Sequence, residues 1–172
     1  MTDSAGVEAW KEQTTAFDRI QSVASAVSQP QPASYIASEA HVAENTARDH
    51  LKRLVELNVL LKSDREGTTL YAPDPLHTRI QMLRDLLEEH DRDGLIQLKG
   101  SLQAQIEDWQ DQYDVESPSE LRDRAVETDT AAQTRDIRKT ASDWELVVYR
   151  LSIVEDAIEN YNTYSEDFQV SA

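Results

Sequence analysis

Residues 35–74 have the sequence "YIASEAHVAENTARDHLKRLVELNVLLKSDREGTTLYAPD". This stretch predicts a short helix, a tight turn, a second helix and a β-hairpin, in that order. Pro32 suits the first turn of the first helix, which we expect to end near His41. The second helix is expected over residues 44–58, where apolar side chains recur at helical spacing. Two runs of apolar and β-branched residues then flank "DREG", in which Gly67 allows a tight hairpin turn.

Helices are also predicted on both sides of this stretch. Upstream, apolar residues recur at spacings of three, four or seven and therefore share one helical face: Trp10, Phe17, Ile20, Ala24 and Val27. Downstream, apolar residues at helical spacing extend from Leu76 to Tyr113, with a break at "HDRDG". Residues 114–136 are polar, and "SPSE" within them suits the start of a short helix.

The last predicted helix carries a regular apolar seam. Its members are spaced by three and four residues in alternation: Trp144, Val147, Leu151, Val154, Ile158 and Tyr161. Such a seam needs a partner helix. We expect these six residues to form a dimer interface; the alternative is that they pack on the helices of residues 76–113 within the same chain.

The composition indicates an acid-coated surface. The 172 residues carry a formal net charge of -16, with 5 Lys and 12 Arg against 33 Asp and Glu. High acidity with little lysine is typical of halophilic archaea, whose concentrated salt screens such charge. The alternative is an ordinary acidic protein.

The sequence gives little support to an enzyme or a membrane protein. It contains no cysteine, and its four histidines have no metal-ligand spacing. There is no glycine-rich phosphate loop and no nucleophile-elbow motif. We therefore expect no catalytic residue, metal or cofactor. The first residues do not resemble a signal peptide and no apolar run would span a membrane, so a cytoplasmic location is expected.

Residues 35–74 resemble the winged helix-turn-helix transcription regulators of the arsenical-resistance and sugar-regulator types. The residues that match the family pattern are Ala37, Val42, Thr46, His50, Leu51, Leu54, Gly67 and Tyr71. The chain departs from the pattern at His41 and Asn58, where these families usually carry glycine.

The resemblance implies a mainly α fold: a winged helix-turn-helix with a small β-hairpin wing, followed by long C-terminal helices. It places a DNA-binding domain at residues 10–75 and a helical, coiled-coil-like dimerisation region at residues 76–165. The implied function is a sequence-specific transcription regulator that binds double-stranded DNA as a homodimer.

The charge distribution is an independent argument for DNA binding. Residues 35–72 hold 5 cationic and 6 acidic side chains, a net charge of -1. The other 134 residues hold 12 cationic and 27 acidic side chains, a net charge of -15. Phosphate contacts would exclude the acidic coat from such a segment.

Nine residues are predicted to contact DNA: Glu44, Asn45, Thr46, Arg48, Asp49, Lys52, Arg53, Lys62 and Arg65. Asparagine binds adenine, arginine binds guanine and carboxylates accept from cytosine, so the start of the second helix is expected to contact bases. Lys52, Arg53 and Lys62 suit phosphates, and Arg65 at the hairpin tip suits a minor groove. The alternative is that the helix cations pair with Glu44, Asp49 and Glu56 on a solvated face.

Two other functions remain open on the same fold. The first alternative is a protein-protein adaptor that does not bind DNA itself, and the second is a ligand sensor. A sensor would hold a small-molecule effector between the C-terminal helices near Trp109 and Trp144.

Overall fold

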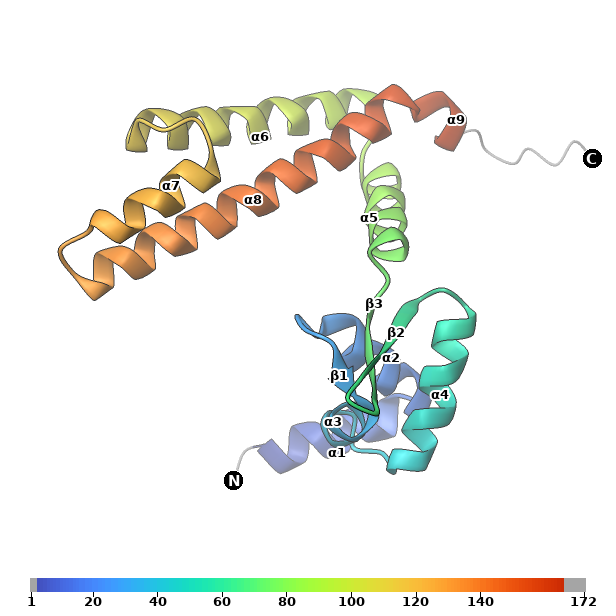
Figure 1. The fold of residues 1–172 in the computed structure, drawn as a ribbon. Coiled ribbons are helices and arrows are strands. Elements are labelled where there is room, and N and C mark those ends of the chain that lie inside the picture. Colours follow the sequence, from blue (N-terminus) through green and yellow to red (C-terminus); the bar gives the residue numbers. More distant parts are fainter. Residues whose placement is uncertain (1–2, 166–172) are drawn as a thin grey trace, which may run out of the picture. The chain divides into compact units, whose positions relative to one another are not determined.

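The protein is mainly helical, with a small antiparallel sheet and long C-terminal helices (Figure 1). The computed structural model describes residues 3–165. The chain divides into two compact units between Ile80 and Gln81.

The N-terminal unit begins with two helices, where the sequence pattern predicted one. α1 spans Asp3–Gln13 and α2 spans Ala16–Ala26. The break arises because Thr15 caps α2: its hydroxyl accepts from the backbone N–H of Asp18, and the Asp18 carboxylate accepts from the backbone N–H of Thr15. The Thr15 hydroxyl also donates to the Asp18 carboxylate at 2.7 Å, and this hydrogen bond, together with the one from the backbone N–H of Thr15, lowers the pKa of Asp18. The capping box therefore contributes stability above the ordinary pKa of an aspartate, and this contribution is lost as the pH falls.

α3 (Ala33–Glu39) and α4 (Glu44–Glu56) follow, and the prediction of a helix from residue 44 is confirmed. Both helices end where a non-glycine residue adopts a left-handed conformation. His41, after α3, has φ 53°, and Asn58, after α4, has φ 58°. This is the backbone conformation for which glycine is usually selected. The tight turn between α3 and α4 therefore forms without glycine.

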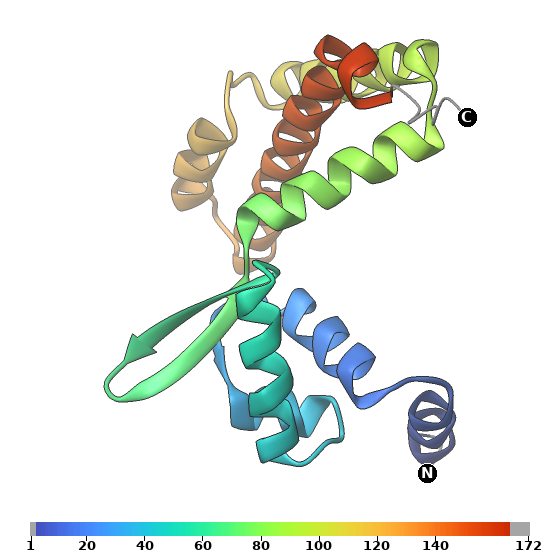
Figure 2. The ribbon, with the colours of Figure 1, turned by 90° about the vertical axis from the view of Figure 1, so that its right-hand side faces the viewer.

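The sheet has the strand order β1-β3-β2 and is antiparallel throughout. The predicted hairpin is confirmed as β2 (Leu60–Arg65) and β3 (Thr68–Pro73). Its two-residue loop, Glu66 and Gly67, has φ 53° and 80°, and positive φ at both positions matches the twist of the strands. Figure 2 shows the hairpin tip projecting away from the helices of this unit. β1 (Gln31–Pro32), which was not predicted from the sequence, adds a third strand beside β3.

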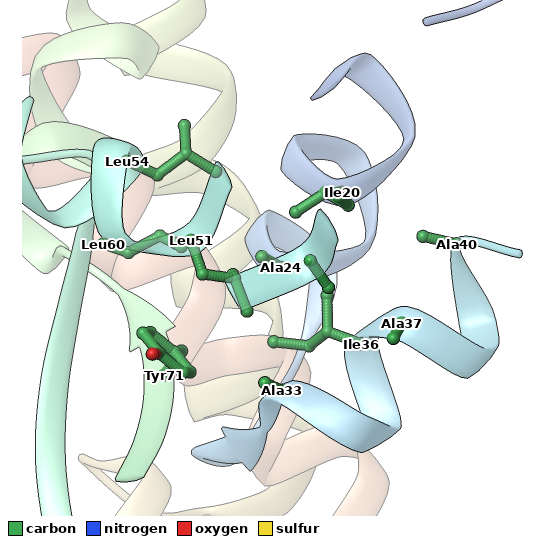
Figure 3. Packing of buried hydrophobic residues seen from close by; sticks show 11 residues of the cluster. Ile20, Ala24, Ala33, Ile36, Ala37, Ala40, Leu51, Leu54, Leu60 and Tyr71 are labelled. Atoms are coloured by element: carbon green, nitrogen blue, oxygen red, sulfur yellow. The ribbon is translucent and has the colours of Figure 1, made fainter. Parts of the chain in front are cut away.

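The core of the N-terminal unit joins helices and sheet. Ile20 of α2, Ile36 of α3 and Leu51 of α4 are fully buried and lie together with Leu60 and Tyr71 from the hairpin (Figure 3). This shared core holds α4 and the hairpin in one rigid arrangement.

Arg19 of α2 is buried with this core, at 8% exposure. Its side chain donates to the backbone carbonyls of Thr14 (2.8 Å), Ala40 (3.0 Å) and Lys11 (3.4 Å). These carbonyls lie at the carboxyl ends of α1 and α3, where the helix dipole favours a positive charge. Arg19 therefore ties α1 to the turn between α3 and α4.

The C-terminal unit is built from helices. They are α5 (Pro75–Glu89), whose first residues belong to the N-terminal unit, α6 (Arg92–Tyr113), α7 (Pro118–Arg124), the 3₁₀ helix η1 (Ala125–Glu127), α8 (Ala131–Glu159) and α9 (Tyr161–Ser165). α6 and α8 run side by side, and α7 packs on α8 (Figure 1). Within residues 114–136, a short helix begins at "SPSE" as predicted: Ser117 is the N-cap of α7, and its hydroxyl accepts from the backbone N–H of Glu120.

The predicted seam packs within the chain. Trp144 and Val154 are buried. The remaining seam residues are partly buried against a cluster that includes Leu95 and Leu102 of α6: Val147, Leu151, Ile158 and Tyr161. Within one chain these residues therefore pack on neighbouring helices, as the intrachain alternative predicted, and their role in a dimer interface stays a prediction.

Candidate nucleic-acid interface

An open groove of about 840 Å³ lies between α4 and the hairpin. One wall comes from α4 and the other from the hairpin, and the end of β1 and the start of α3 contribute the rest of the lining. The residues that line it are Pro32, Ala33, Ser34, Glu44, Arg48, Asp49, Lys52, Val55, Glu56, Lys62, Ser63, Asp64, Gly67, Thr68, Thr69 and Tyr71.

The α4 wall follows from the amphipathic pattern of that helix. Ala47, Leu51 and Leu54 are buried against the core of the N-terminal unit. The opposite side of the helix lines the groove with Val55 and five charged residues: Glu44, Arg48, Asp49, Lys52 and Glu56. Four of these five were predicted to contact DNA, and the structure brings them together on one wall.

Arg48 is paired on the helix surface. Its Nη2 donates to Oε1 of Glu44, one turn earlier in α4. The side chains are 62% and 46% exposed, respectively, so the pair remains in solvent. This contact is one of the ion pairs that the solvated-face alternative predicted.

Arg53 has a different environment from the groove cations. Its guanidinium carbon lies 5.8 Å from the centre of the Phe17 ring in α2, close enough for a cation-π contact. Asn45 is exposed and Thr46 is half-buried on α4, and neither lines the groove. These three predicted residues belong to α4 but lie outside the groove wall.

The hairpin wall carries Lys62 and Asp64 of β2. Lys62 is opposite Tyr71 and Asp64 is opposite Thr69, so these pairs share one face of the hairpin. Asp64 Oδ1 accepts from the backbone N–H of Gly67 at 3.1 Å and so stabilises the loop. Arg65, at the end of β2, is exposed but does not line the groove.

The uncharged polar residues that line the groove were not predicted from the sequence. Ser34 at the start of α3 and Thr68 and Thr69 of β3 add hydroxyl groups to the groove. Hydroxyls can donate to phosphate oxygens or contact base edges. The alternation of the hairpin could have indicated Thr69, but nothing in the sequence places Ser34 opposite α4.

The two units differ strongly in charge. Residues 1–80 carry 8 cationic and 11 acidic side chains, a net charge of -3. Residues 81–172 carry 9 cationic and 22 acidic side chains, a net charge of -13. The repulsion that a polyanion would meet is therefore concentrated in the C-terminal unit.

Among residues 3–165, no group of three or more His, Asp or Glu side chains is arranged to hold a metal ion. None of the helices in that same range combines the length and hydropathy that crossing a membrane requires.

Comparisons with known proteins give a family without an assigned activity. No curated protein and no solved structure was found to match the chain. A family described as "Family of unknown function (DUF7342)" matches residues 14–163, which is most of the chain. The chain therefore belongs to the DUF7342 family.

Proposed function

We propose that the N-terminal unit is a winged helix-turn-helix domain and that the protein is a sequence-specific DNA-binding transcription regulator acting as a homodimer. In this proposal α3 and α4 are the helix-turn-helix, α4 is the recognition helix and the β2–β3 hairpin is the wing. The protein would then be cytoplasmic, because the DNA that it binds lies there.

The observation that carries the proposal is the groove between α4 and the hairpin. Arg48 and Lys52 from α4 and Lys62 from β2 line the same open groove. A major groove about 12 Å wide admits one α-helix, and a neighbouring hairpin then meets the flanking backbone. Lys52 on α4 and Lys62 on the hairpin supply the cations that contacts with phosphates require, and Arg48 is assigned to a guanine edge.

The charge distribution supports the same assignment. The N-terminal unit has a net charge of -3 against -13 for the rest of the chain, so it is the less repulsive surface for DNA. It is still not basic. Affinity must therefore depend on a few placed side chains and on dimerisation, with little contribution from a broad positive field.

Arg48→Ala is expected to weaken binding to the operator by about 5- to 150-fold, the value of one good arginine-guanine contact. The measurement is a band shift on the DNA upstream of the protein's own gene, over a series of KCl concentrations. Lys52→Ala and Lys62→Ala are expected to weaken binding to all duplexes alike and to reduce the salt dependence, because these residues are assigned to phosphates.

Arg150→Ala is the matched control for this experiment. Arg150 is an exposed arginine of α8 in the acidic C-terminal unit, and its removal changes the net charge by the same amount. It is expected to leave operator affinity unchanged within about twofold. If the parent shifts no duplex at any KCl concentration, the regulator proposal fails and the adaptor becomes the better assignment.

The homodimer has its own test. Helix-turn-helix dimers bind two half-sites about one helical turn of DNA apart, which requires a fixed link between the two recognition helices. Light scattering on the full chain is expected to give twice the chain mass of 19.5 kDa. A mass of one chain at every concentration would remove the dimer.

We also infer a halophilic archaeal source from the composition. The net charge of -16 and the excess of arginine over lysine support it. In that setting the acidic side chains near the groove take up cations when DNA binds, which reduces the usual loss of affinity as salt rises.

A further inference from the structure

The ion pair between Glu44 and Arg48 lies in the groove that we propose to bind DNA. It lies on the proposed recognition helix and both members line the groove, where a polyanion is expected. An acidic side chain at this position weakens every phosphate contact nearby. The pair therefore opposes non-specific DNA binding at the centre of the proposed interface.

Folding gains little from the pair. An exposed pair with i, i+4 spacing has a small effect on helix stability, and salt screens it. Glu44 is also the first residue of α4, where a negative charge meets the helix dipole, but this effect is small at an exposed site too. Neither effect requires an arginine as the partner.

Arg48 can contact a base while it is still hydrogen-bonded to Glu44. The contact joins only Nη2 of Arg48 to Oε1 of Glu44. A guanidinium has five N–H donors in a planar fork, so other donors remain for the two acceptors of a guanine edge. The rise from residue 44 to residue 48 is about 6 Å. It corresponds to about two base pairs at about 3.4 Å each.

We propose that Glu44 is a specificity-determining residue that positions Arg48 for guanine and itself accepts from the amino group of a nearby cytosine. This inference rests on the proposed function. The substrate class is then duplex DNA whose half-site has a guanine and a cytosine within about two base pairs of each other. The charge of Glu44 penalises arrangements in which Arg48 meets a phosphate.

The test compares the parent with three variants on two DNA duplexes. The first duplex is selected by the parent from a random library, and the second is a scrambled version of it. Glu44→Gln is expected to bind the scrambled duplex a few times more tightly and the selected duplex no more tightly. The ratio of the two affinities should therefore fall about tenfold, within the range expected for one base contact.

Two variants separate positioning from charge. Glu56→Gln removes the same charge from the same helix and groove, and is expected to tighten binding to both duplexes equally, with an unchanged ratio. Glu44→Asp keeps the charge but shortens the side chain, so Arg48 loses its partner. This variant is expected to lower the ratio of the two affinities without an increase in affinity for the scrambled duplex.

The outcomes distinguish this inference from the proposed function. If Glu44→Gln and Glu56→Gln both leave the ratio unchanged, Glu44 acts only through its charge and the inference is overturned, while the regulator stands. If the parent selects no motif and binds neither duplex in any KCl concentration, the proposed function itself is lost. A selected motif without guanine would overturn the role assigned to Arg48 and Glu44 together.

Discussion

Trp144→Ala is expected to destabilise the C-terminal unit by about 3–5 kcal/mol, the range for removing a large aromatic side chain from a core. Trp144 is only 1% exposed, and its ring centre lies 5.8 Å from that of Trp109 in α6. It also packs with Leu121 of α7, so it joins three helices. Its loss leaves a cavity that the surrounding backbone cannot fill.

The measurement must separate the two units, because a chain of two units does not unfold in a single step. Hydrogen exchange in low denaturant does so: the amides of α6 and α8 should lose protection, while those of α4 keep theirs. Leu146→Ala is the control on the same helix. Leu146 is 66% exposed, and its replacement is expected to change stability by less than about 0.5 kcal/mol. Equal effects of the two variants would contradict the packing described for α8.

Arg19→Met is expected to destabilise the N-terminal unit by about 2–4 kcal/mol. Methionine keeps much of the buried stem but donates no hydrogen bond, so the carbonyls of Thr14 and Ala40 lose a charged donor at 2.8 and 3.0 Å. Hydrogen bonds to charged groups contribute about 1.5–3 kcal/mol each, and a buried carbonyl without a partner adds to the loss. The DNA affinity that we propose is expected to fall together with stability, because this side chain holds the turn before α4.

Arg53→Met is the matched control, since Arg53 is an exposed arginine of the same unit that contacts the Phe17 ring. Its replacement is expected to cost about 1 kcal/mol or less. The readout is the urea concentration at which the amides of α2, α3 and α4 lose protection. If Arg19→Met costs no more than Arg53→Met, the carbonyl contacts do not contribute as inferred.

Much of the candidate site could be predicted because it lies within one continuous stretch of sequence. Helix α4 and the hairpin have local signals: the helical spacing of Ala47, Leu51 and Leu54, and the two-residue loop at Glu66 and Gly67. The groove-facing charges of α4 follow from the same spacing, because residues between buried positions must point outward. The position of Arg53 over Phe17 could not be predicted, because it depends on how α2 packs against α4.

The N-terminal region shows where a periodic pattern misleads. Trp10 and Phe17 fit one helical face, yet they lie on separate helices. Two signals competed: the apolar period favoured a continuous helix, and the threonine three residues before Asp18 favoured a cap. The cap prevailed because it satisfies two backbone N–H groups, at Thr15 and Asp18, that would otherwise need partners at the start of α2.

The sequence by itself determined the order of the elements from α3 to β3, the turn at Gly67 and the contrast between a nearly neutral segment and an acidic chain, because all of these depend on neighbouring residues. Only the tertiary structure decided the rest. An apolar seam specifies that a partner helix exists but not which one, so the packing of α8 on α6 could not be derived from spacing. An arginine appears the same in sequence whether buried or exposed, and Arg19 is buried because two helix ends present their carbonyls to it.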